Sequence, residues 1–157
     1  MKTRLFGGIV VAALVIGATV AAVSLATASP DITRPQTIRV DAVTNEFSFL
    51  DLGHRGPSQG DEIIFHDALR RGGHTVGHDG GVCTLTSVRH GEFQCVVTMS
   101  LRDGEVTFTG LLKPGHGIFR AVFPVTGGSG IYQNVRGEAV VDQVTQRLAH
   151  ITVRLIP

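Results

Sequence analysis

Asp67 is the residue of this 157-residue chain best placed for acid–base chemistry. It follows His66 in a short apolar segment, and because neighbouring residues of a strand point to opposite faces, only one of the two can face an interior. Asp67 shares its face with Ile63, Phe65 and Leu69. A carboxyl group enclosed by such side chains has a raised pKa and can act as an acid or a base. We predict Asp67 as a catalytic residue and Phe65 as a ligand contact; the structural alternative is that Asp67 accepts hydrogen bonds from a turn or pairs with an arginine.

Two further polar side chains are candidate ligand contacts. Arg120 follows apolar residues at 118 and 119, where a guanidinium group needs a carboxylate partner or a bound anion. An ion pair with Asp67 or Glu138 and a clamp on a ligand are both compatible with this setting. Tyr132 is the only tyrosine, and its hydroxyl could point into the mouth of a barrel, although packing at a corner of the chain is the simpler interpretation.

Other polar clusters do not have specific spacing. His74, His78 and Asp79 suggest a metal site, because alternate strand positions would align the two imidazoles. The glycines around them indicate a loop and no further ligand is well placed, so no metal is predicted. Ser87 or Ser100 could join a histidine in a catalytic triad, but no nucleophile-elbow sequence supports one.

The segment 126–137 (TGGSGIYQNVRG) concentrates four glycines between two apolar runs. A Walker loop needs a Lys-Ser/Thr pair after its last glycine, and a dinucleotide fingerprint needs a third glycine that opens a helix. The segment has neither, and β-branched residues follow it. It therefore predicts a strand, a tight turn and another strand. No cofactor is expected.

The first 28 residues have the form of a secretory signal peptide. Lys2 and Arg4 precede an apolar run at 5–26, which ends in small residues. The run is long enough to span a bilayer, so an uncleaved membrane anchor is the alternative. Cleavage would leave a flexible leader at 29–35 and one domain at 36–157. We predict a protein that is secreted or lies in the cell envelope.

The charge of the cleaved chain argues against nucleic acid as a partner. Cleavage removes two of the 14 Lys and Arg residues, which leaves twelve against 13 Asp and Glu. Lys113 is then the only lysine. No basic patch remains that would attract nucleic acid.

Cys83 and Cys95 are the only cysteines. In an exported protein, an even pair most economically forms a disulfide. If the two face each other across antiparallel strands, the turn centres on Arg89 and Leu85 pairs with Phe93. The alternative is a free thiol inside a barrel, with a catalytic role.

Short β-branched segments separated by Gly, Asp and Pro clusters indicate an all-β protein. About nine such segments can form a sandwich or a barrel, and closure removes exposed strand edges. Runs that are apolar on both faces, at 63–65, 111–112 and 139–141, predict an oligomer interface. A turn is expected at 79–81. Strands are expected at 36–43, 46–52, 61–69, 82–88, 93–101, 105–112, 118–125, 137–144 and 148–155, with a short one at 74–76.

Four segments of the chain have a specific order and spacing: 60–69 (GDEIIFHDAL), 76–85 (VGHDGGVCTL), 105–110 (EVTFTG) and 126–132 (TGGSGIY) with Gly137. Together they resemble the allene oxide cyclase and dirigent-like barrel superfamily. The resemblance covers most of the chain from about residue 51, and it matches Cys83 to a cysteine of the family and Asp67 to a position where plant cyclases have asparagine. It implies an eight-stranded antiparallel β-barrel, often trimeric, around an apolar cavity.

The resemblance also implies a function. Such a cavity holds an apolar, reactive small molecule in one conformer, so that ring closure or radical coupling gives one stereoisomer without a cofactor. Orienting a molecule for an intramolecular reaction contributes up to about 7 to 11 kcal/mol. An enzyme of this type would be an isomerase or cyclase. The alternatives are a non-catalytic small-molecule carrier and an interaction barrel of the cell envelope.

Overall fold

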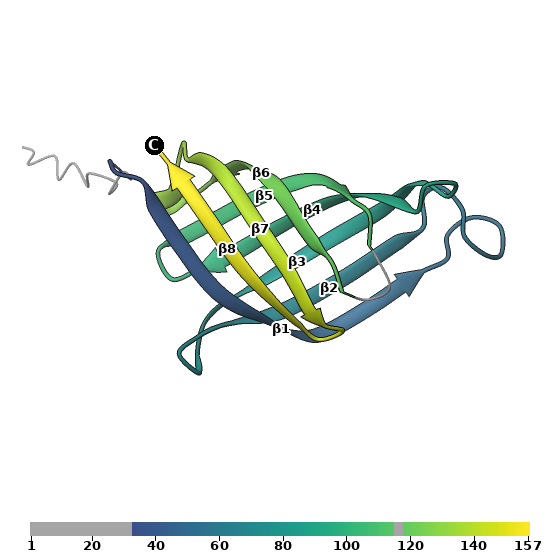
Figure 1. The fold of residues 1–157 in the computed structure, drawn as a ribbon, viewed down its shortest axis with the longest axis horizontal. Coiled ribbons are helices and arrows are strands. Elements are labelled where there is room, and N and C mark those ends of the chain that lie inside the picture. Colours follow the sequence, from purple (N-terminus) through teal and green to yellow (C-terminus); the bar gives the residue numbers. More distant parts are fainter. Residues whose placement is uncertain (1–32, 115–117) are drawn as a thin grey trace, which may run out of the picture.

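Eight antiparallel strands close into one barrel (Figure 1). The computed structural model describes residues 33–114 and 118–157. Each strand pairs with its neighbours along the chain, and β1 pairs with β8 to close the sheet. The predicted eight-stranded barrel is confirmed. The strands are β1 (Gln36–Leu50), β2 (Glu62–Arg71), β3 (His74–Ser87), β4 (Glu92–Leu101), β5 (Gly104–Leu112), β6 (Arg120–Gly128), β7 (Arg136–Thr145) and β8 (Leu148–Ile156).

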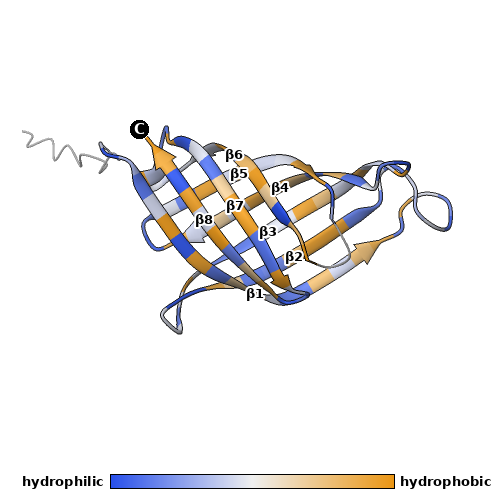
Figure 2. Ribbon diagram, in the orientation of Figure 1, coloured by the Kyte–Doolittle hydropathy of each residue, from blue (hydrophilic) through white to orange (hydrophobic). Residues whose placement is uncertain are grey.

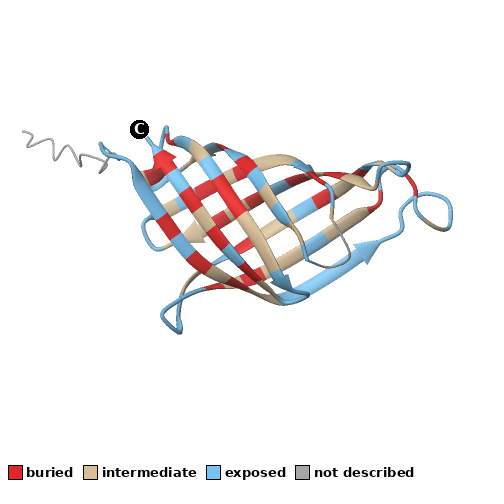
Figure 3. Cartoon of the chain, viewed as in Figure 1, coloured by how far each residue is buried: buried red, intermediate tan, exposed pale blue. Residues whose placement is uncertain are grey.

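Apolar and polar residues alternate along the strands, and so do buried and exposed ones (Figures 2 and 3). In β4 the inward residues are at most 9% exposed, whereas Val96 between them is 50% exposed. This period of two places one set of side chains inside the barrel. The inward residues of β4 are Phe93, Cys95, Val97 and Met99.

β3 is longer than the sequence predicted. The prediction of a turn at 79–81, between two separate strands, is wrong, because Gly80 and Gly81 lie in an unbroken ladder with β2. A Cβ atom at Gly81 would overlap the ring of Phe65. The glycine at 81 therefore makes room for an aromatic ring and does not form a turn.

β1 is also one strand where two were expected, at 36–43 and 46–52. A bulge between Thr44 and Glu46 joins the two parts. Before the bulge β1 pairs with both β2 and β8, and beyond it β1 pairs with β2 alone. The second part runs beside β2 beyond the last residues that β1 pairs with β8 (Figure 1). At the bulge the Thr44 N–H donates to the carbonyl of Arg147 in the β7–β8 turn over 3.0 Å.

The glycine-rich segment lies at the opposite end of the barrel, where it forms the end of β6, the 3-10 turn η1 (Gly130–Tyr132) and the start of β7. Gly130 has a φ of 61°, and a Cβ atom there would overlap the carbonyl of Asp103 in the β4–β5 turn. The lack of a side chain thus lets two turns touch. Tyr132 packs into the core behind them and is 7% exposed.

A disulfide between Cys83 and Cys95 joins β3 to β4. The two residues pair directly, and Leu85 pairs with Phe93, so the predicted disulfide and register are confirmed. Both cysteines are buried in the barrel wall. The cross-link fixes the relative position of two strands that line the interior.

The signal peptide predicted at 1–28 lies outside the described residues, and so does most of the leader predicted at 29–35. Within 33–114 and 118–157, no helix has the length and apolar character needed to cross a membrane.

Candidate functional site

The barrel holds a cavity of about 950 Å³ that opens at the end near the β7–β8 turn. This volume lies in the range of small-molecule binding sites. Five of the eight phenylalanines of the chain line the cavity, from β1, β2, β5, β6 and the segment before β6. They are Phe47, Phe65, Phe108, Phe119 and Phe123.

Asp67 and Asp79 form a carboxyl pair in the wall of this cavity. They occupy directly opposed positions on β2 and β3 and are 7% and 1% exposed. Asp67 lies on the inner face with Ile63 and Phe65, as its alternation predicts. The sequence suggested Asp79 only as a possible metal ligand and not as a cavity residue, because the glycines that follow it indicated a loop. The spacing of Asp79 and Cys83, which puts both on one face of a strand, is the signal that could have identified it.

The surroundings of the pair favour one proton shared between the two carboxyls. Burial first, and then the negative charge of Asp67 and its hydrogen bond, raise the pKa of Asp79 from an ordinary 3.8 to about 8. Burial also raises the pKa of Asp67, against the hydrogen bonds of Thr44 and Asp79 and the charge of His66. At neutral pH the pair therefore retains a proton, and Asp79, with a pKa of about 8, can donate it.

Apart from the contact between the two carboxyls, Oδ1 of Asp67 and both side-chain oxygens of Asp79 have no hydrogen-bond partner among the described residues. Buried polar atoms are costly unless they are paired, so the pair is not explained by stability. It is available to interact with a molecule in the cavity.

Arg120 lies on the outer surface of the barrel and does not line the cavity. Its guanidinium group donates to both oxygens of Asp142, at 2.8 and 3.1 Å, so its partner is neither Asp67 nor Glu138. An exposed pair of this kind contributes little to stability. Tyr132 is at the closed end, outside the cavity lining, where burial raises the pKa of its hydroxyl.

The histidines near the pair lie on the outside. His66 stacks on His78 with ring centroids 5.3 Å apart, while Asp79, next in the chain, faces the interior. His74 is exposed at the start of β3. In the part of the chain that the structure describes, no three His, Cys, Asp or Glu side chains gather as a group that could hold a metal ion.

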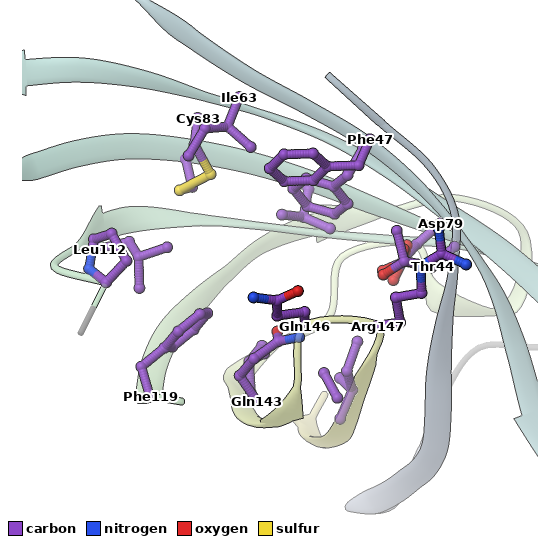
Figure 4. Close-up of a pocket in the computed structure, with 18 of the residues that line it drawn as sticks. Thr44, Phe47, Ile63, Asp79, Cys83, Leu112, Phe119, Gln143, Gln146 and Arg147 are labelled. Carbon is purple, nitrogen blue, oxygen red and sulfur yellow. A yellow bond between two sulfur atoms is a disulfide. The ribbon is translucent and has the colours of Figure 1, made fainter. Parts of the chain in front are cut away.

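Polar side chains from the bulge of β1 and from the β7–β8 turn form the rim of the cavity. Figure 4 shows Arg147 with Thr44 and Asp79 on one side, and Leu112 and Phe119 on the other. The sequence did not identify this rim, since its residues come from a turn and from a bulge that only the closed barrel brings together. Its residues are Thr44, Asn45, Glu46, Gln143, Gln146 and Arg147.

Gly81 controls how much of the cavity is open beside the carboxyl pair. The ring of Phe65 lies where a side chain at 81 would be, and Val97 Cγ2 is 3.0 Å from that position. In Gly81→Ala the ring must move toward the cavity. The displaced ring takes up part of the cavity volume, so we expect the neutral fluorescent probe N-phenyl-1-naphthylamine to bind about ten-fold more weakly, which corresponds to about 1.4 kcal/mol. The double variant Gly81→Ala/Phe65→Ala should restore its binding, and unchanged affinity in the single variant would contradict this role.

The chain matches the family model of the allene oxide cyclase barrel like domain over residues 36–154. The chain belongs to this family. The predicted resemblance is thereby confirmed, and the eight-stranded barrel described above is that of an allene oxide cyclase-like domain. Among curated proteins no relative was found.

Solved structures with the same fold include several enzymes. A pyocyanin demethylase is 30% identical with a TM-score of 0.69, and the match covers 77% of this chain and all of the demethylase. AbnU, an exo-specific intermolecular Diels–Alderase, is 14% identical with a TM-score of 0.63 over 77% of this chain and 97% of its own. The pterocarpan synthase dirigent protein GePTS1 is also 14% identical, with a TM-score of 0.59 over 78% of this chain and 88% of its own. The last two similarities show the fold alone.

Proposed function

We propose that this allene oxide cyclase-like barrel binds an apolar small molecule and catalyses its isomerisation or cyclisation by proton transfer, without a cofactor. The supporting observation is the Asp67–Asp79 pair, which offers a proton donor and a carboxylate in the wall of an apolar cavity. An acid whose pKa lies close to the working pH is well matched to general acid catalysis. The surrounding phenylalanines would restrict the conformers of the bound molecule and exclude water.

In this mechanism Asp79 gives its proton to one atom of the bound molecule, and the pair takes a proton back from another atom. The reaction therefore conserves the composition of the molecule and needs no oxidant. Asp67 stabilises the protonated form of Asp79 before transfer and can share the returning proton. The shape of the cavity, which Phe65 and Gly81 help to set, would determine which isomer forms.

The test uses a metabolite extract of the organism in which the chain occurs. Wild type and Asp79→Asn are incubated with the extract, and the products are compared by liquid chromatography and mass spectrometry. We expect wild type to produce a new peak of unchanged mass, and Asp79→Asn to slow its formation by about 10² to 10⁴-fold, as for the loss of a general acid. Asp142→Asn, a surface change of the same type, should behave as wild type. If wild type retains a bound compound but converts none, the protein is a carrier.

The similarity to the pyocyanin demethylase supports a second candidate, demethylation of a heteroaromatic molecule, because that match spans the whole demethylase at 30% identity. The same experiment separates the two candidates. Isomerisation leaves the mass of the substrate unchanged, whereas demethylation yields a product that lacks one CH₂ unit. The carbon of that unit would leave as methanol, with water as co-reactant, or as formaldehyde, with water and a two-electron acceptor from the extract as co-reactants.

We also propose that the mature protein is exported and forms a homo-oligomer, a trimer by family resemblance. The support on the outer surface is an apolar row across three strands, in which Ile64 pairs with Val82 and Val82 with Val96. Their exposed fractions are 37%, 37% and 50%. Native mass spectrometry of protein from its host tests both statements: a monomer would contradict the assembly, and an intact N-terminus would contradict cleavage.

A further inference from the structure

We infer that the cavity selects a flat organic cation that is otherwise apolar, such as an N-alkylated or protonated heteroaromatic ring, over neutral and anionic molecules of the same shape. The inference rests on small-molecule binding in the cavity, which is part of the proposed function, and adds the charge and shape of the ligand. It follows from three features of the cavity wall: its aromatic rings, the negative charge of its buried carboxyl pair and the position of its basic side chain, Arg147.

The aromatic rings come from several sides of the cavity. Phe65 lies against Gly81, and Phe108 and Phe123 are neighbours, with ring centroids 5.7 Å apart. Phe47 and Phe119 are nearer the open end, which brings the number of lining phenylalanines to five. Ring faces attract cations, and the attraction is larger where water is excluded.

The negative charge lies in the wall of the same cavity, where Asp67 pairs with the rim residue Thr44 on one side and with Asp79 on the other. The negative charge of Asp67 helps to hold the proton on the directly opposed Asp79, so the pair bears a negative charge. Of the cavity-lining residues that the structure describes, Arg147 is the one cation, and no ion pair joins it to either carboxyl. The ion pairs found among the described residues are Arg120–Asp142 and His150–Asp41, and both are on the outside of the barrel. In a water-poor cavity an unpaired charge acts over several ångströms, so a cationic ligand gains from the carboxylate even without touching it.

Among the described residues that line the cavity, Arg147 is the one basic side chain, and it lies at the rim in the β7–β8 turn. It is exposed and shares the rim with Glu46, whose charge is opposite. Water screens both groups, so they contribute little to selection by charge. The interior therefore determines the sign of the preferred ligand.

The experiment compares three probes of one shape at neutral pH by fluorescence titration: N-methylacridinium, acridine and acridine-9-carboxylate. For wild type we expect N-methylacridinium to bind at least about ten-fold more tightly than acridine, and acridine-9-carboxylate most weakly, as one charge interaction would give. Asp79→Asn keeps the carboxylate of Asp67 and should keep the preference. Asp67→Asn/Asp79→Asn has the same amide at 79 but no charge, and should bind the cation and acridine within about two-fold of each other.

Two outcomes would overturn the inference. If acridine binds as tightly as N-methylacridinium to wild type, or if the preference survives in the double variant, the carboxyl pair does not select a cation, although binding in the cavity and the proposed function stand. If none of the three probes binds while N-phenyl-1-naphthylamine does, the inference also fails and the cavity function stands. If no probe of either kind binds, the proposed function fails as well. Asp142→Asn, which removes a carboxylate from the outer surface, should leave all affinities unchanged.

Discussion

Asp79→Asn is expected to make the protein more stable than wild type at alkaline pH. In the folded state the pKa of Asp79 is about 8, whereas in the unfolded chain it returns to about 3.8. Between these values the folded state binds one proton more than the unfolded state, so the stability of wild type decreases as pH rises. Asparagine at position 79 does not titrate, so the free energy of unfolding of the variant does not decrease in this way as pH rises. The free energies of unfolding of the two proteins should therefore diverge by about 2 to 3 kcal/mol between about pH 6 and about pH 9.

Urea unfolding at a series of pH values measures this divergence. Asp142→Asn is the matched control, because it removes a carboxylate of the outer surface from an exposed ion pair. Its pH dependence over the same range should follow that of wild type. Parallel curves for wild type and Asp79→Asn would show that Asp79 is already ionised at neutral pH, and the shared proton would be excluded.

Removal of the disulfide is expected to have an effect of similar size. Cys83 and Cys95 are 12 positions apart in the sequence, and the bond between them closes a short loop in the unfolded chain. Loss of such a cross-link raises the entropy of the unfolded state and costs about 3 kcal/mol. The double variant Cys83→Ala/Cys95→Ala should therefore unfold at a clearly lower urea concentration than wild type.

Reduction provides the control for this prediction. Wild type treated with dithiothreitol loses the same bond without a change of sequence, and it should move toward the unfolding midpoint of the double variant. Both cysteines line the cavity, so the double variant also shows whether the disulfide shapes it. Equal midpoints for oxidised wild type and the double variant would mean that the bond adds no stability.

The sequence predicted the barrel fold better than it predicted the residues of the candidate site. Alternation placed Asp67 on the inner face of β2, because side chains of a strand point to its two faces in turn. The cysteine pairing gave the register of β3 and β4, because the two cysteines lie opposite each other in one hairpin. The sequence did not predict that Asp79 lines the cavity, and it did not predict the rim. The reasons differ. The glycines after Asp79 are typical of a turn, yet Gly81 lies under the ring of Phe65, a contact between two strands that no local pattern reveals. The rim combines β1 with the β7–β8 turn, which are about 100 residues apart and meet only when the barrel closes.

Arg120 illustrates the limit of alternation. Its apolar neighbours suggested a buried guanidinium group, but it lies on the outer face, where it pairs with Asp142 across β6 and β7. The side of the wall on which a residue lies depends on the register between strands, which sequence alone does not fix. Tyr132, in contrast, lies in the turn that the sequence indicated, and it is buried in the core at the closed end.

The most direct test of the shared proton is the titration of the Asp79 carboxyl carbon by NMR. Protein labelled with ¹³C at aspartate side chains is titrated from acid to alkaline pH, and the Asp79 signal is assigned by its loss in Asp79→Asn. We expect a midpoint of about 8 in wild type. It should fall in Asp67→Asn, which removes the negative charge and the hydrogen bond that help to raise it. A midpoint close to 3.8 in wild type would contradict the account, because Asp79 would then hold no proton to donate at neutral pH.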